Sequence, residues 1–263
     1  MKVQTFNLWD NTPGMCEEIP KITYYEPQNI TSPWSIVILP GGGYAGRAEH
    51  EGKGYAEFFV NNGINAFVVD YRVSPHRFPL PLLDSRRAIR YVRYYAEKFG
   101  VNKDKVAIMG SSAGGHLSAL TSTYFDKIDF EGIDDIDKED FIPNAQILCY
   151  PVIKLLGAKV SHIGSGMNLL GEKYAELAER VTPELIASEK TPPAFIWHTL
   201  NDQAVPVISS LDYAEALRKN NVPAELHIFP DGPHGLGLAD NDENYAHVSK
   251  WSSLLLDWLE YIK

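Results

Sequence analysis

Cysteine is scarce in this chain, with only Cys16 and Cys149 among 263 residues. So few thiols argue against a disulfide framework and against a cysteine-ligated metal cluster. We therefore expect no metal site. Cys149 lies in an apolar run, which is typical of an inert buried thiol.

Positive charge and long apolar runs are also in short supply. The chain has 24 Lys and Arg against 34 Asp and Glu, a formal net charge of −10. This balance argues against nucleic acid and anionic membrane as partners, because both require basic patches. No segment approaches the roughly 18 apolar residues of a membrane helix, and the N-terminus lacks the apolar core of a signal peptide. We expect a cytoplasmic protein that acts on a small molecule. The oligomeric state stays open, a homo-oligomer included.

Strand-like and helix-like segments alternate along almost the whole chain. This pattern predicts an α/β fold with a mainly parallel central sheet, helices on both faces and right-handed crossovers. Neither a repeat nor a flexible linker divides the sequence, so we expect one domain over residues 1–263. A long interval between strands, residues 155–190, predicts a small lid-like insertion. The expected strands cover 2–7, 21–25, 35–39, 65–70, 144–150, 194–198 and 224–229; a strand–turn–helix unit covers 106–120; and the expected helices cover 55–61, 82–99, 207–219 and 245–261.

One segment stands out by its charge. Residues 126–140 are dense in Asp and Glu, and such runs are usually solvated surface. The spacing of an EF-hand calcium loop is absent. We therefore expect an acidic surface insertion without a bound ion.

The strand–turn–helix unit at 106–120 contains a G-x-S-x-G pattern with Ser112 at its centre. In this context the pattern predicts a nucleophile elbow, a tight turn that lifts a serine hydroxyl above the sheet. The serine would be held in a strained backbone conformation, and Gly110 and Gly114 would fit because they lack a Cβ atom. The helix that begins at Ala113 would point free amides at any anion formed on the serine.

Residues suited to acyl transfer follow four of the expected strands. Glycines 41–43, Ser112, Asp202 and His234 each come after a strand, and the carboxyl ends of parallel strands share one edge of a sheet. The order Ser, Asp, His is that of the α/β-hydrolase arrangement. The histidine would act as the base, the carboxylate would orient it, and backbone amides would hold the oxyanion.

Other residues compete for two of these roles. Asp231 and Asp240 are alternative acids that lie nearer to His234 along the chain, although the position after a strand favours Asp202. His116 lies on the elbow helix, and His198 and His227 lie in strands, so these three are expected to be structural.

Several longer motifs make the chain resemble the α/β-hydrolases of the esterase/lipase class, most closely the small bacterial acetyl-xylan or sugar-ester esterases. The motifs are LPGGGY at 39–44, HEG at 50–52, AFVVDYRVSP at 66–75, PLPLLDSRRAIRYVR at 79–93, GSSAGGHL at 110–117, HTLNDQAVPV at 198–207 and GPHGLGLA at 232–239.

The resemblance implies an α/β-hydrolase fold and a serine esterase without metal or cofactor. It implies Ser112 as nucleophile, Asp202 as acid and His234 as base. Pro40 stands where the related lipases begin their glycine loop with His, which favours the sugar-ester branch. The oxyanion amides implied by the resemblance are those of Gly42, Gly43 and Ala113.

Three other functions remain open: those of a serine peptidase, of an arylesterase that acts on small molecules, and of a non-catalytic binding protein. Substrate contacts are expected from Tyr44, His50 and Arg72, which follow strands or the glycine loop. Trp9, Phe78 and Arg77 are further candidates.

Overall fold

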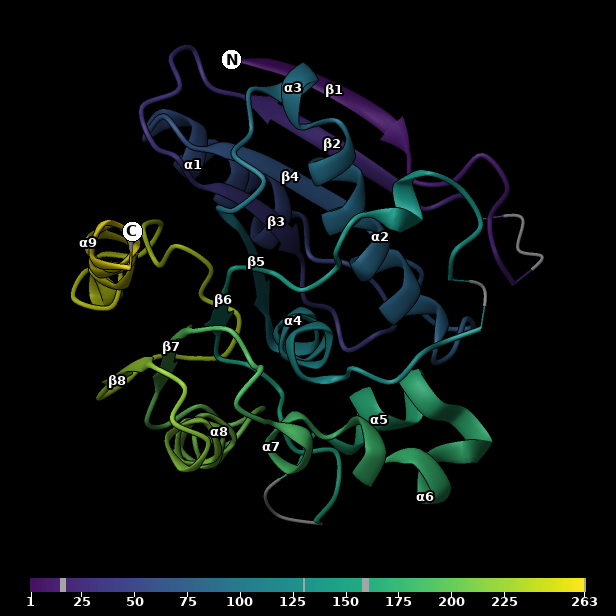
Figure 1. The fold of residues 1–263 in the computed structure, drawn as a ribbon. Coiled ribbons are helices and arrows are strands. Elements are labelled where there is room, and N and C mark those ends of the chain that lie inside the picture. Colours follow the sequence, from purple (N-terminus) through teal and green to yellow (C-terminus); the bar gives the residue numbers. More distant parts are fainter. Residues whose placement is uncertain (15–17, 130, 158–160, 263) are drawn as a thin grey trace.

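An eight-stranded sheet forms the centre of the computed structural model, which describes residues 1–14, 18–129, 131–157 and 161–262. The strand order is β1-β2-β4-β3-β5-β6-β7-β8. Strand β2 pairs antiparallel with β1 and β4, and every other neighbouring pair is parallel (Figure 1). The predicted mainly parallel sheet is confirmed. The strands are β1 Lys2–Asn7, β2 Lys21–Glu26, β3 Ser35–Leu39, β4 Asn65–Asp70, β5 Val106–Ser111, β6 Ala145–Cys149, β7 Ala194–Thr199 and β8 Ala224–Phe229.

Helices cover both faces of this sheet. The α-helices are α1 Tyr55–Asn61, α2 Leu80–Tyr94, α3 Ala96–Phe99, α4 Ser112–Thr123, α5 Ile163–Leu170, α6 Tyr174–Leu177, α7 Pro183–Ile186, α8 Ile208–Lys219 and α9 Trp251–Tyr261. Shorter turns of helix are η1 His50–Gly54, η2 Ile136–Lys138, η3 Gly171–Lys173, η4 Glu179–Val181 and η5 Glu243–Tyr245. Not one of the described helices is long and apolar enough to cross a membrane.

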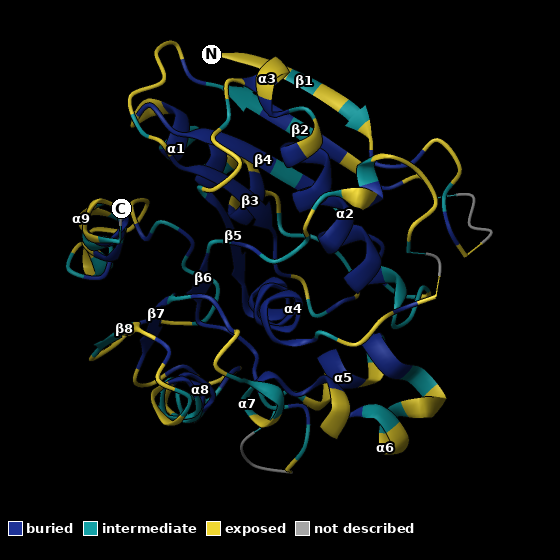
Figure 2. Ribbon diagram, viewed as in Figure 1, coloured by how far each residue is buried: buried dark blue, intermediate teal, exposed yellow. Residues whose placement is uncertain are grey.

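Side chains of β3 alternate between two apolar clusters. Val37 and Leu39 pack with α2 and α4, whereas Ile36 and Ile38 pack with α1 and α9 on the opposite face. All of β3 is therefore buried, as expected of a strand covered on both sides. Figure 2 shows the same for α4, which is buried along its whole length. A buried apolar centre thus supports the strand ends at which the expected site residues lie.

Two predicted helices end or begin elsewhere. The expected helix at 82–99 is divided because Tyr95 leaves helical backbone angles, and Gly100 in the left-handed region then ends α3. The expected helix at 245–261 begins later, at Trp251, because Asp242 caps a separate short turn at Glu243–Tyr245.

The acidic segment at 126–140 lies at the surface as expected, with Asp126, Asp134 and Asp135 exposed, but two of its carboxylates are not solvated. Glu131 lies 2.9 Å from the Arg86 guanidinium, and Asp137 lies 2.9 Å from that of Arg87. Both arginines project from α2 and are buried. Glu131 and Asp137 are therefore counter-ions of a buried basic face on that helix. Cys149 is buried as expected, whereas Cys16 lies outside the described residues.

Candidate active site

Ser112 lies at the turn between β5 and α4 with a positive φ of 51°. A non-glycine residue in this region is strained and needs support from its surroundings. Gly110 and Gly114 allow the turn: a Cβ atom on Gly110 would overlap the carbonyl oxygen of Gly114, and one on Gly114 would overlap that of Leu39. The local geometry is that of the predicted elbow.

The side chains of Ser112, His234 and Asp202 form one hydrogen-bonded row. Ser112 Oγ is 2.8 Å from His234 Nε2, and His234 Nδ1 is 2.6 Å from Asp202 Oδ2. The serine hydroxyl can donate to Nε2 while Nδ1–H donates to the carboxylate. Three residues far apart in the sequence thus meet at the carboxyl ends of β5, β7 and β8.

The Asp202 carboxylate is fully buried, and hydrogen bonds from protein groups replace its contacts with water. Its Oδ1 accepts hydrogen bonds from the amides of Ala204 and Val205, both at 2.9 Å. Burial acts to raise the pKa of Asp202, but hydrogen bonds from His198, His234 and the Val205 amide outweigh it and hold the pKa well below its ordinary value. The carboxylate is therefore ionised at neutral pH, as a partner for an imidazolium must be.

The competing residues lie elsewhere. Asp231 is paired with the His247 ring at 2.9 Å, and Asp240 lines a surface groove. His227 is bound to its strand neighbour Glu225 at 2.7 Å. His198 is fully buried and contacts Asp202 at 3.3 Å, on the carboxylate rather than at the serine. None of these side chains is hydrogen-bonded to Ser112 or His234 among the described residues.

The glycine loop after β3 lies against the serine. A Cβ atom on Gly41 would come within 3.1 Å of Ser112 Cβ. The Gly41 amide donates to Glu51 Oε2 at 2.8 Å, whereas no described group accepts from the amides of Gly42 or Gly43. Both of these glycines have positive φ, 141° and 63°. Ala113 lies in the first turn of α4, where amides lack an intrahelical acceptor. Donors for an oxyanion are therefore available beside the serine.

Comparison with known proteins shows the family to which the chain belongs. The profile of the family described as BD-FAE matches residues 22–217. This chain belongs to the BD-FAE family. It is 36% identical over 241 residues to an endo-1,4-beta-xylanase B of Butyrivibrio fibrisolvens, with 89% of this chain and 36% of that protein covered. It is also 36% identical over 227 residues to an acetylxylan esterase of Xylanibacter ruminicola, with 82% of this chain and 45% of that protein covered. The chain thus spans less than half of the length of these curated relatives.

A solved structure matches this chain over nearly the whole length of both proteins. The acetyl ester-xyloside bifunctional hydrolase from Caldicellulosiruptor lactoaceticus is 41% identical, with a TM-score of 0.90, 98% of this chain and 96% of that chain covered. This likeness confirms the predicted α/β-hydrolase fold. The region of the family match contains Ser112, Asp202 and the glycine loop, and it ends before His234.

Two expected substrate contacts are wrong for this BD-FAE protein. Arg72 is fully buried and makes a two-point ion pair with Asp84, at 2.9 Å and 2.8 Å. Tyr44 is also fully buried, and its hydroxyl is 2.8 Å from Nδ1 of His116. Both side chains turn into the core because each finds a buried polar partner there. His50 alone reaches the surface, where its ring Nε2 is 2.9 Å from the carbonyl of Gly235.

The weaker aromatic candidates also serve packing. Trp9 is buried, and its indole N–H donates to Asp84 at 3.2 Å. Phe78 is half-buried and packs edge-on against Tyr124. Neither ring forms an exposed platform on which a sugar could stack. The Arg77 guanidinium donates to the Asn168 carbonyl.

Sequence reasoning missed residues that the segment at 155–190 brings to the site. Asn168 on α5 donates to the Gly43 carbonyl at 2.9 Å, and Ser165 Oγ is 4.0 Å from where a Cβ atom on Gly43 would lie. Burial lowers the pKa of His162, the nearby His234 ring lowers it further, and Asp202 opposes both. No sequence motif signals these contacts, because each depends on how the segment folds back over the glycine loop.

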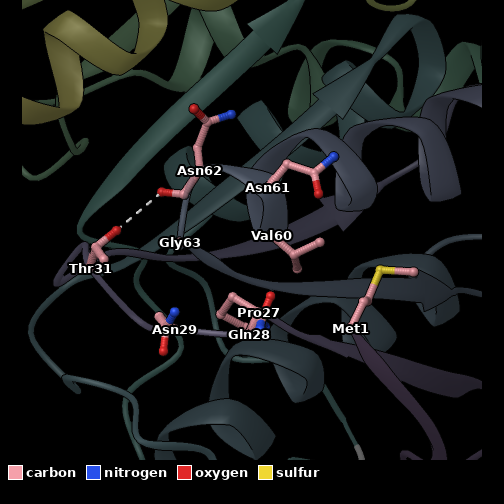
Figure 3. Close-up of a pocket in the computed structure, with 9 residues that line it drawn as sticks. All are labelled: Met1, Pro27, Gln28, Asn29, Thr31, Val60, Asn61, Asn62 and Gly63. Atoms are coloured by element: carbon pink, nitrogen blue, oxygen red, sulfur yellow. Dashed lines mark hydrogen bonds between the residues drawn. The ribbon is translucent and has the colours of Figure 1, made fainter.

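A groove of about 430 Å³ lies apart from these residues. Its lining includes Met1, Asn29, Thr31 and Asn62, between the end of α1 and the segment after β2 (Figure 3). Thr31 Oγ1 closes one side by donating to the Asn62 carbonyl at 3.4 Å. It contains none of the predicted catalytic residues, so its size does not make it the candidate site.

Proposed function

We propose that this chain is a serine carboxylesterase that removes acetyl or other short acyl groups from carbohydrate. The observation that carries this proposal is the hydrogen-bonded row of Ser112, His234 and Asp202 at one edge of the sheet. The names of the xylanase and the acetylxylan esterase relatives, and of the acetyl ester-xyloside hydrolase, support an acetylated sugar as the substrate.

The reaction begins when His234 Nε2 takes the proton of Ser112 as the serine Oγ forms a bond to the ester carbonyl carbon. The carbonyl oxygen becomes an oxyanion, held by the amides of Gly42, Gly43 and Ala113. The bond to the sugar oxygen then breaks, and His234 donates the proton to that oxygen. The products of this half are a free sugar hydroxyl and an acyl group on Ser112.

Water completes the cycle. It gives a proton to His234 and adds to the acyl carbon, and the second oxyanion uses the same amides. Collapse breaks the bond to Ser112 Oγ, the proton returns to the serine, and the carboxylic acid leaves. Asp202 remains ionised throughout and stabilises the imidazolium in both halves.

The direct test is Ser112→Ala. We expect hydrolysis of p-nitrophenyl acetate to fall by at least 10³-fold without loss of folding, because the nucleophile is absent. Ser122→Ala is the matched control, since Ser122 lies on the same helix and its hydroxyl donates to the Ser118 carbonyl. Unchanged hydrolysis by Ser112→Ala would contradict the assignment.

A substrate panel tests the finer part of the proposal. Acetylated xylo-oligosaccharides, acetylated monosaccharides, aryl esters and aminoacyl amides are compared by kcat/KM. The highest value is expected for an acetylated sugar. A preference for aryl esters would favour an arylesterase, and hydrolysis of amides would favour a peptidase.

The organisation expected from the sequence also stays a proposal. Residues 1–263 form one domain, and residues 155–190 act as a lid; the support is that the sheet runs through all eight strands and that α5 contacts Gly43. The cytoplasmic location remains a prediction from the sequence, and the oligomeric state stays open.

A further inference from the structure

Glu51 carries a buried carboxylate that the mechanism does not use. Only 3% of the residue is exposed, and among the described residues no Lys or Arg lies within ion-pair distance. The imidazole of His50 lies with its Nε2 atom 3.9 Å from Glu51 Oε1. Burying a charge without a cation is unfavourable unless hydrogen bonds replace its solvation. The groups that make those bonds therefore indicate what the carboxylate is for.

One carboxylate oxygen holds the glycine loop. Oε2 accepts from the Gly41 amide at 2.8 Å, and Gly41 directly precedes the two glycines whose amides are free for an oxyanion. The hydrogen bond fixes the peptide plane at the start of that loop. It also means that the Gly41 amide already has an acceptor within the protein.

The other oxygen holds the loop of the catalytic histidine. Oε1 accepts from the Tyr150 hydroxyl at 2.7 Å, and that hydroxyl accepts from the Gly237 amide at 2.9 Å. The Tyr150 ring lies edge-on to the His234 ring, with centroids 5.0 Å apart. Gly237 and His234 belong to the same loop after β8, so the tyrosine supports the imidazole directly and through the backbone.

We propose that Glu51 is a positioning residue that couples the oxyanion loop to the loop of the catalytic base. A single carboxylate bridges the two loops. Its two short hydrogen bonds fix the position of the Gly42 and Gly43 amides relative to the His234 ring. This inference rests on the proposed function, because it assigns a role within that active site. It predicts an effect on the transition state rather than on substrate binding.

The test compares Glu51→Gln and Glu51→Ala with the native chain, using p-nitrophenyl acetate and active sites counted with a fluorophosphonate. We expect Glu51→Ala to lower kcat by about 10²-fold with KM changed less than twofold, since displaced oxyanion donors cost 10²–10³-fold when lost. Glu51→Gln should lie between the two, because its amide oxygen can still accept from Gly41. Glu57→Gln is the control: that glutamate is nearby, exposed and paired with Lys53, and its kcat should not change.

A second variant keeps the test decisive if Glu51→Ala fails to fold. Tyr150→Phe removes only the bridging hydroxyl and should lower kcat by about tenfold. The double variant with Glu51→Gln should be no slower than the slower single variant, because both break one connection. A kcat within twofold of native in Glu51→Gln and Tyr150→Phe, with only the Tm lowered, would overturn the positioning role. A native chain that neither hydrolyses esters nor reacts with the fluorophosphonate would instead overturn the proposed function.

Discussion

Replacing Arg72 by alanine separates a structural role from the substrate contact expected from the sequence. The Arg72 guanidinium donates to both oxygens of Asp84, at 2.9 Å and 2.8 Å, and neither side chain is exposed. Without it the Asp84 carboxylate keeps only the Trp9 indole and the backbone amide of residue 72 as donors. The variant would therefore contain a buried charge without a counter-ion.

The expected loss of stability in Arg72→Ala follows from that geometry. Breaking a buried ion pair by removing one partner costs about 3–5 kcal/mol. For a domain somewhat smaller than this one, 1 kcal/mol corresponds to about 2–4 °C in Tm, so the Tm should fall by about 10 °C. Burial acts to raise the pKa of Asp84 and the Arg72 hydrogen bonds oppose it. Without the arginine the folded state therefore prefers the neutral acid, and the deficit in stability should be smaller at pH 5 than at pH 8.

The assay is thermal unfolding at both pH values, together with kcat and KM for p-nitrophenyl acetate measured well below the Tm. Arg218→Ala is the control, since that exposed arginine pairs with Glu215 on the same helix, and the Tm of this variant should not change. Arg72→Met with Asp84→Leu should regain much of the stability, because an apolar pair carries no buried charge. An unchanged Tm with a raised KM would refute this reasoning and restore Arg72 as a substrate contact.

Three further predictions concern His116, Cys149 and Gly114. Burial lowers the pKa of His116 from 6.5 to about 4. As the pH falls, the unfolded chain therefore binds this proton before the folded protein does, and the free energy of unfolding should fall by about 3 kcal/mol between pH 6.5 and pH 4. Urea unfolding measures this fall, which should be less steep in His116→Gln. Burial raises the pKa of Cys149 to about 12, so peptide mapping after iodoacetamide at pH 8 should find it unmodified in the folded protein and alkylated in urea. A Cβ atom on Gly114 would overlap backbone atoms, whereas one on Gly54 would meet open space. In thermal unfolding and kinetic assays, Gly114→Ala should therefore lower stability by about 1–3 kcal/mol and reduce esterase activity. Gly54→Ala is the control and should leave both unchanged.

The features predicted well are those written locally in the chain. Apolar periodicity over five or six residues defined the strands, and the glycines around Ser112 defined the elbow because backbone atoms there leave no room for a Cβ atom. The order of residues after the strands indicated Asp202 and His234, since parallel strands bring their carboxyl ends to one edge.

The features predicted badly depend on partners far along the chain. Nothing in the sequence distinguished Glu131 and Asp137 from their exposed acidic neighbours, because their counter-ions are on α2, with Glu131 and Arg86 separated by 45 positions. Arg72 and Tyr44 looked available to substrate because nothing near them in sequence shows the buried groups they meet. The bridge from Glu51 to Tyr150 spans 99 positions.

The sequence by itself determined the strands, the elbow and the types of residue at the sheet edge, because steric and hydrophobic preferences act between neighbours. Only the tertiary structure decided which charged and polar side chains are buried in pairs and which face the substrate. A buried charge is stable only beside its partner, and folding alone brings such partners together.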